Sequence, residues 1–243
     1  MIKIVEYEKI DEVDYILEGF PGIGLVATMV ASYLIDKLKM RVIASIESNQ
    51  FPPLTSIHEG KPLPPARIYY DEKSKLAIFF SEFVIPPALV YEISDLIIDY
   101  ATKKHTKLII SVGGLTGGKE GASIAYAAAS NQKMLKVLEE AGAIPITEGA
   151  TTGVNGIVLS KSAQLGIDAI SILLPVDPKF TNPRHAQIAI DILKKIIPLD
   201  VDTTQLAREA EMLERQIKDT LTTHKKKINS YKKIMHDYGG MYV

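Results

Sequence analysis

The sequence contains no cysteine and no tryptophan. Without cysteine, disulfides, thiolate metal sites and a cysteine nucleophile are excluded. The longest apolar stretch, residues 22–35, covers 14 residues, whereas a helix needs roughly 20 to span a bilayer. The first residues, Met-Ile-Lys-Ile-Val-Glu, lack the apolar core of a signal peptide. We therefore expect a cytoplasmic protein without a membrane span.

An excess of charge of one sign is also lacking. The chain has 28 Lys and Arg against 29 Asp and Glu, for a net charge of −1. This balance gives no general affinity for polyanions, and the interleaved aromatics typical of nucleic-acid binding are missing. The charge is nevertheless uneven, because residues 203–243 carry eight basic residues and five acidic ones. Such asymmetry favours an appendage with a partner of its own.

What is present over residues 1–199 is an alternation of predicted strands and helices. This pattern predicts a three-layer α/β/α domain with a mainly parallel sheet. The opening strand–helix–strand unit, residues 15–48, predicts a parallel pair joined by a right-handed crossover. A proline-rich loop or insertion is predicted at 51–66 and a hairpin at 67–80. Further helices are predicted from residue 86, in the alanine-rich stretch after 121, and at 134–141, 158–164 and 183–197. Further strands are predicted at 108–112, 144–147 and 168–174.

A different pattern begins at Thr203. Apolar positions recur there every three or four residues between polar ones, which predicts a long coiled-coil-type helix over residues 200–238. A stripe this narrow favours a partner helix, most simply a symmetry mate, or a shallow groove. The alternative is a helix packed along its own domain. Residues 199–202 are predicted as a hinge, with Asp202 or Thr203 as the helix N-cap. The stripe consists of Leu206, Ala210, Leu213, Ile217, Leu221, His224, Ile228, Tyr231 and Met235.

Within the last five residues, 239–243, two glycines separate an apolar end from this helix. Chain ends are normally polar and frayed. Our hypothesis is that Met241, Tyr242 and Val243 form a docking plug on a flexible tail, with Gly239 and Gly240 as its hinge. The alternative is that the end folds back onto its own domain.

Glycine-rich loops offer the main candidate chemistry. The segment from Gly22 through Gly24 to Ala27 fits the dinucleotide-binding pattern, with Glu47 at the end of the next strand. Phe20-Pro21 argues against it, because a bulky ring and a fixed φ stand where backbone would wrap a pyrophosphate. The alternative is a tight strand-to-helix turn.

The loop at residues 113–118 nearly matches a phosphate-binding loop, but Glu120 stands where Ser or Thr must bind magnesium. Together with residues 149–156, these small-residue loops should gather at the carboxyl edge of the sheet. There they would form a pocket for a small anion, or an interface. The five histidines show no metal-ligand spacing. We expect no metal, no cofactor and no enzymatic activity.

The motif Glu18-Gly-Phe-Pro-Gly-Ile-Gly24 and the later loop at 113–117 resemble the signatures of the proteasome assembly chaperone family, over about residues 1–199. The Met-Tyr-Val end is similar to the hydrophobic–Tyr–any-residue (HbYX) tail of proteasome activators. The residues that carry the domain resemblance, whether structural or ligand-binding, are Gly19, Phe20, Pro21, Gly22, Gly24, Gly113, Gly114 and Gly117.

The resemblance implies a nucleoside-phosphorylase-like domain without that catalysis, in a homo-oligomer, with a tetramer suggested. Archaeal members with this tail would dock on the α-ring of the core proteasome without ATP, opening the gate or aiding assembly. The Val243 carboxylate would pair with a lysine between α subunits, Tyr242 would pack at the gate and Met241 would fill the apolar part. Two alternatives stay open: a nucleoside- or nucleotide-binding enzyme using the glycine loops, and a self-assembling scaffold.

Overall fold

The computed structural model describes residues 2–58, 60–116, 124–178 and 181–212. Several predicted positions lie outside these ranges. They are Gly117, the stripe positions Leu213, Ile217, Leu221, Ile228, Tyr231 and Met235, the hinge glycines Gly239 and Gly240, and the tail residues Met241, Tyr242 and Val243.

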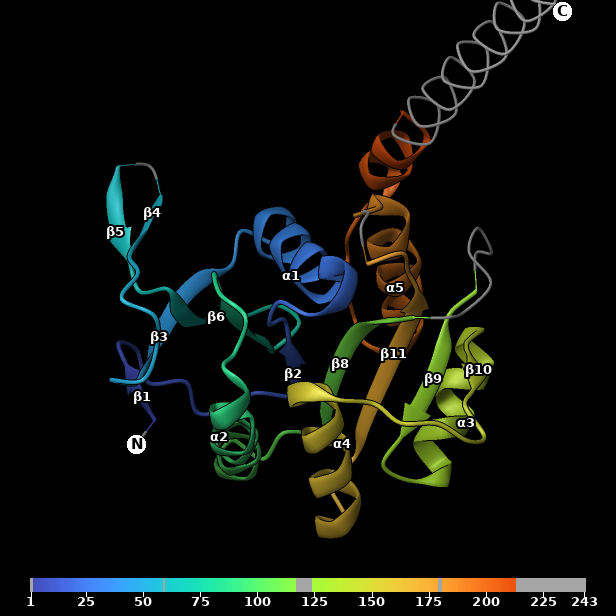
Figure 1. Cartoon of the computed structure of the whole chain (residues 1–243), viewed down its shortest axis with the longest axis horizontal. Coiled ribbons are helices and arrows are strands. Elements are labelled where there is room, and N and C mark those ends of the chain that lie inside the picture. The colour runs from blue at the N-terminus through green and yellow to red at the C-terminus, as the bar shows by residue number, and fades with distance from the viewer. Residues whose placement is uncertain (1, 59, 117–123, 179–180, 213–243) are drawn as a thin grey trace, which may run out of the picture.

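One nine-stranded sheet organises the described chain (Figure 1). Its order is β1-β3-β6-β7-β2-β8-β11-β9-β10. The central block β7-β2-β8-β11 is parallel, whereas β1, β3, β6 and β7 pair antiparallel, as do β11 and β9. The strands are β1 (Lys3–Glu6), β2 (Tyr15–Glu18), β3 (Arg41–Glu47), β6 (Ala66–Asp71), β7 (Leu76–Ser81), β8 (Leu108–Leu115), β9 (Tyr126–Ala129), β10 (Ile144–Pro145) and β11 (Ala169–Pro175).

Helices cover both faces of this sheet, which confirms the mixed α/β architecture. One apolar cluster joins the sheet to α1 (Val26–Lys37), α3 (Gln132–Ala141) and α5 (Pro183–Ile196). A second joins the opposite face to α2 (Val90–Lys103) and α4 (Gly153–Leu165). Because the central strands are covered on both sides, they consist of nearly continuous apolar runs, as in β11, where every residue is buried.

Local signals set the helix limits. The Asn131 side chain accepts a 3.0 Å hydrogen bond from the Met134 backbone N–H, which caps the start of α3. Gly142 ends the same helix in the left-handed conformation, with φ 101°. Helix α4 begins five residues earlier than the sequence predicts, at Gly153.

Two sequence predictions need correction, and a third, the proline-rich insertion, gains detail. Strands β2 and β3 run in the same direction but are not neighbours, because the β6–β7 hairpin lies between them. The alanine-rich stretch is not a helix where it is described. It forms β9, since pairing with β11 outweighs the helix propensity of alanine. The proline-rich insertion contains a small separate hairpin, β4 (Ser56–His58) with β5 (Lys61–Leu63), which projects from the body in Figure 1.

The C-terminal helix is described over residues 204–212. Its start is capped by the Asp202 carboxylate, which accepts a 2.9 Å bond from the Thr204 backbone N–H. Leu206 and Ala210 are buried at 5% and 0% exposure. Leu206 belongs to the core cluster that contains α1 and α5. The prediction that these two stripe positions await a partner helix is therefore wrong, because their own domain covers them.

Polar contacts fix this helix base further. The Tyr33 hydroxyl donates to the Asp202 carbonyl oxygen at 2.8 Å, and Lys37 Nζ donates to Gln205 Oε1 at 2.7 Å. We call the contact of residues 202–210 with α1 and α5 the helix joint. Figure 1 shows the helix leaving the body beyond α5. Within the described residues, no helix is long and apolar enough to cross a membrane.

Candidate functional site

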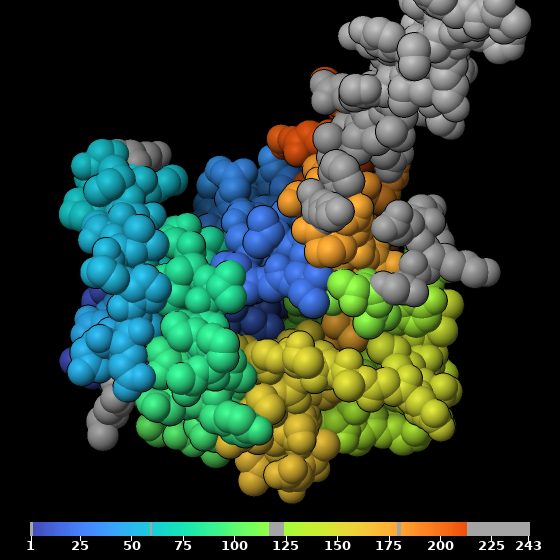
Figure 2. All heavy atoms as spheres, in the orientation of Figure 1, coloured from blue at the N-terminus to red at the C-terminus, as the bar shows by residue number. Residues whose placement is uncertain are grey.

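A cavity of about 350 Å³ lies at the carboxyl ends of β2 and β8. Its walls come from three segments: residues 20–23 after β2, residues 113–116 at the end of β8, and residues 150–155 at the start of α4. Val84 and Ile85 close another side. Figure 2 shows the blue, green and yellow segments that supply these residues meeting around a hollow on the near face. The predicted gathering of small-residue loops at one rim is thus confirmed for the described residues.

A row of polar side chains crosses the sheet beneath this cavity. Glu18 of β2 pairs in register with Ser111 of β8, and Ser111 pairs with Ser171 of β11. All three are buried, at 4%, 2% and 0% exposure. We call them the polar row. Since residues in register on neighbouring strands share a face, the polar row faces the same layer, that of α2 and α4.

Glu18 is the ionisable member of the polar row. Its Oε1 accepts a 3.2 Å hydrogen bond from the Phe20 backbone N–H, and the Ser111 hydroxyl also bonds to the carboxyl. Burial disfavours the charged form and raises the pKa of Glu18 to about 8, despite these two bonds, which lower it. At pH 7 the neutral carboxylic acid is therefore the predominant form of this side chain.

Asn155 lies over the end of the polar row. A Cβ atom at Gly113 would stand 3.2 Å from Asn155 Nδ2, so the amide packs directly on the strand there. Its Oδ1 is buried and has no hydrogen-bond partner among the described residues. A buried unpaired acceptor costs about 1–3 kcal/mol. The first turn of α4, to which Asn155 belongs, also lacks a side-chain cap at Thr152.

The glycines of the first loop are explained mainly by close packing. A Cβ at Gly19 would meet Ala31 Cβ at 2.6 Å, and one at Gly24 would meet Val176 Cγ2 at 2.9 Å. Gly24 also adopts φ +67°, which favours glycine. A Cβ at Gly114 would lie 2.3 Å from the Ile23 carbonyl oxygen. These contacts favour the tight-turn interpretation over the dinucleotide one.

Gly22 and Gly113 are less tightly packed than these three, and both line the cavity, as does Gly114. A Cβ at Gly22 would meet nothing within 4 Å. Phe20 also lines the cavity and is buried at 3% exposure, and Pro21 lies beside it. Gly113 and Gly114, predicted as loop residues, belong instead to β8, which continues to Leu115 because it pairs with β11 from Ile109 to that end.

Sequence reasoning did not foresee the roles of Glu18, Ser171 and Asn155. A usable signal was present for Glu18, since an acidic residue closes an otherwise apolar strand, Tyr-Ile-Leu-Glu. No comparable signal marked Ser171 or Asn155. Their importance depends on strand register and on the position of α4, which are properties of the folded chain.

Comparison with known proteins identifies the family. Residues 16–221 match the PAC2 family. The chain belongs to the PAC2 family. This result confirms the family resemblance drawn from the glycine motifs, of whose described glycines Gly22, Gly113 and Gly114 line the cavity.

Solved structures and curated sequences agree with this assignment. PbaA of Pyrococcus furiosus, described as an archaeal homolog of proteasome-assembly chaperone, is 29% identical, with a TM-score of 0.80 over 100% of this chain and 99% of that one. PbaB of the same organism, described as an archaeal proteasome activator, shares the fold at 24% identity and a TM-score of 0.77, over 90% of this chain and 98% of that one. The uncharacterized protein MJ0106 of Methanocaldococcus jannaschii is 29% identical over 96% of both chains.

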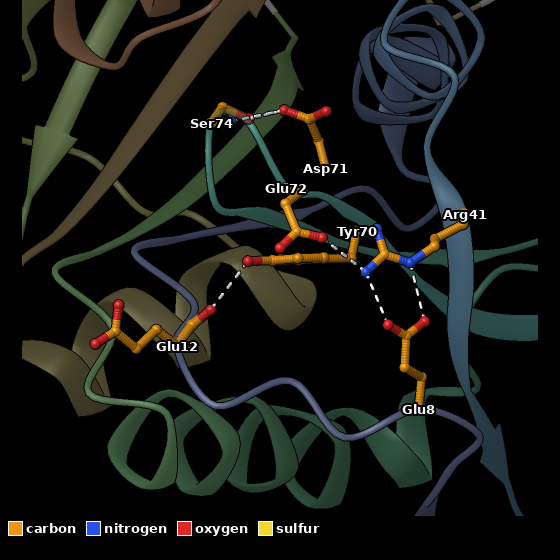
Figure 3. Close-up of polar contacts among 7 residues, drawn as sticks. All are labelled: Glu8, Glu12, Arg41, Tyr70, Asp71, Glu72 and Ser74. Atoms are coloured by element: carbon orange, nitrogen blue, oxygen red, sulfur yellow. Dashed lines mark hydrogen bonds and ion pairs between the residues drawn. The ribbon is translucent and has the colours of Figure 1, made fainter.

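A second polar cluster of this PAC2 domain is structural in character (Figure 3). Arg41 on β3 makes a two-pronged ion pair with Glu8 at 2.9 Å and a further contact with Glu72 at 3.0 Å. The Tyr70 hydroxyl donates to the Glu12 carbonyl oxygen at 3.1 Å. Hydrogen bonding from Arg41 lowers the pKa of Glu8. These contacts fasten the segment between β1 and β2 to the sheet.

The part of the chain that the structure describes contains no candidate metal-binding site. No group of three or more His, Cys, Asp or Glu side chains is placed there to hold a metal ion.

Proposed function

We propose that this PAC2 protein is a non-enzymatic, ATP-independent partner of the core proteasome. It docks Met241, Tyr242 and Val243 into pockets of the α-ring, and thereby opens the gate, aids assembly, or does both. The observation that carries the proposal is the match along the whole chain to PbaA, a proteasome-assembly chaperone homolog. The shared fold with PbaB, a proteasome activator, supports it.

The chemistry of the tail supports docking at an inter-subunit pocket. A C-terminal carboxylate at Val243 would make a charge-assisted contact with a lysine, and capture of a chain end is a recurring recognition mode. Tyr242 would bring an apolar ring with a polar tip, which suits a pocket that is partly wet. Gly239 and Gly240 would let the tail turn into the pocket.

The helix joint supports presentation of the tail away from the body. Leu206 and Ala210 anchor the start of the helix in the core, so its exit direction is set by packing rather than by a loose hinge. A three-residue plug binds weakly alone. In a homo-oligomer, for which we propose a tetramer, several tails would gain affinity through effective concentration, by roughly 10²-fold or more.

Co-sedimentation with archaeal core proteasomes tests this proposal. We expect Tyr242→Ala, or removal of residues 241–243, to abolish binding while the protein keeps its fold and oligomeric state. Tyr238→Ala is the matched control, because it removes a tyrosine from the same segment outside the motif. Equal co-sedimentation of the tail-less protein would overturn the docking proposal.

Peptidase activity separates the two roles of such a complex. Gate opening predicts faster cleavage of a short fluorogenic peptide in the absence of ATP, with no increase for Tyr242→Ala. A purely assembly-related role predicts unchanged peptidase activity but faster formation of core particles from separate α and β subunits.

A further inference from the structure

The cavity is built like a binding site for a small molecule, independently of any proteasome contact. Its volume of about 350 Å³ lies within the range of small-ligand sites, which are mostly apolar with a few well-placed polar groups. Here the apolar walls are formed by residues such as Ile23, Val84, Val112 and Leu173. The polar side chains are Glu18, Asn155 and three threonines at the loops, Thr116, Thr151 and Thr152. Glu18 and Asn155 are the two whose hydrogen-bonding groups are buried.

The Glu18 and Asn155 side chains stand over one face of the sheet at a defined spacing. Glu18 is in register with Ser111, and Asn155 packs on Gly113, two residues further along β8. Residues two apart on a strand point to the same face and are about 7 Å apart. One small ligand can therefore contact both side chains.

The hydrogen-bonding needs of these groups are complementary. Glu18 accepts bonds from Phe20 and Ser111, and burial keeps its carboxyl protonated at neutral pH, so its own O–H proton is still available for donation. The buried Asn155 Oδ1 is an acceptor without a donor among the described residues. At Glu18 and Asn155 the site thus offers one donor and requires one donor in return.

Charge narrows the class of ligand. Of the described residues lining the cavity, Glu18 is the only ionisable one, and none is Lys, Arg or His. A phosphate or carboxylate would find no basic side chain among them, and a cation would find a neutral acid. An uncharged ligand is favoured because it avoids the cost of burying a charge without a partner.

We propose that this cavity binds a small uncharged molecule through an amide or lactam edge, whose C=O accepts from the Glu18 carboxyl and whose N–H donates to Asn155 Oδ1. The apolar walls would hold a flat or aliphatic body attached to that edge. Of the nucleoside- or nucleotide-binding alternative, this proposal keeps only an uncharged ligand and gives no role to phosphate.

Calorimetric titration of the full-length chain at pH 7 tests the proposal, with nicotinamide and hypoxanthine as probes. We expect saturable binding below about 1 mM for at least one of them. Nicotinate is the matched anion of nicotinamide, and it should bind at least about 10-fold more weakly, as should inorganic phosphate. No saturable binding of either probe, or equal binding of nicotinate, would overturn the proposal.

Variants locate the binding at these residues. Glu18→Gln keeps a donor and an acceptor in the same place and should change the affinity by less than about 3-fold. Asn155→Leu removes the acceptor and should weaken binding at least about 10-fold. Gly22→Phe should abolish binding without disturbing the fold, because a side chain there enters the open cavity. An unchanged affinity in folded Gly22→Phe protein would place the ligand elsewhere and refute the assignment.

Discussion

Glu18 lies at the end of a strand in the middle of the sheet, 4% exposed, where nearly every neighbouring side chain is apolar. Burying a carboxyl there is costly unless it is neutral or well bonded. Two hydrogen bonds do not offset that cost, and the pKa of Glu18 rises to about 8. Its protonation state is therefore coupled to folding.

That coupling predicts a pH-dependent stability. The folded chain holds a proton that the unfolded chain releases above its ordinary pKa of 4.5. The stabilisation is thus complete below pH 4.5 and is lost as the pH rises through 8. Relative to Glu18→Gln, the wild type should lose on the order of 4 kcal/mol of unfolding free energy between pH 5 and pH 9. Urea unfolding of both proteins at several pH values measures this difference, and parallel curves would contradict it.

Gly114 is fixed by a backbone contact rather than by its own torsion angles. A Cβ would meet the Ile23 carbonyl oxygen at 2.3 Å, and backbone cannot move aside cheaply. We expect Gly114→Ala to destabilise the fold by about 2–3 kcal/mol. Gly22→Ala is the matched control, with φ −139° and free space around the added methyl group, and should stay within about 0.5 kcal/mol of wild type. Thermal unfolding compares the two.

At the scale of elements, the helix joint decides how firmly the C-terminal helix is attached. Leu206 contributes apolar burial, and the bonds from Tyr33 and Lys37 add polar contacts at the same place. The polar contacts are exposed to water and contribute little alone. Burial of Leu206 should therefore dominate the attachment.

Leu206→Ala should cost about 2–4 kcal/mol, because it leaves a cavity at the joint. It should also speed amide hydrogen exchange in residues 204–212 more than in α2 or α4. Met212→Ala is the control, since Met212 is 62% exposed. Equal exchange rates in the two variants would show that the joint does not depend on Leu206.

Elements with a strong period could be predicted from the sequence, and those decided by pairing could not. Helix α5 ends within one residue of its predicted limit, because proline and a clear apolar face mark it. The β6–β7 hairpin was also predicted correctly. Strand β9 was missed, since alanine favours helices locally and only pairing with β11 and β10 makes it a strand. The gathering of the site's loops at one edge could be predicted from the sequence. Their chemistry could not, because it depends on strand register.

At the scale of the whole molecule, the core does not stop at residue 199, where the sequence pattern changes. Leu199, Val201, Leu206 and Ala210 are all buried in the described structure. We propose that the folding unit reaches Ala210 and that the independent appendage begins beyond it. This placement differs from a boundary drawn by composition alone.

Two truncations test that boundary. A chain ending at Met212 keeps every buried residue of the joint and should unfold with nearly wild-type stability. A chain ending at Asp202 loses Leu206 and Ala210 and should be destabilised by about 3 kcal/mol or more. Chemical denaturation of both chains gives the answer. Equal stability of the two truncated chains would instead place the boundary at residue 199.

The polar row has a consequence for how the sheet is assembled. Strands β2, β8 and β11 are far apart in the sequence, and their apolar runs could pair in several alignments. A slip of one residue would place Val112 or Ile110 opposite Glu18 and remove its bond to Ser111. The carboxyl would then be buried without that partner, so misaligned pairing is penalised during folding. The polar row therefore favours one alignment of the three central strands over the slipped ones.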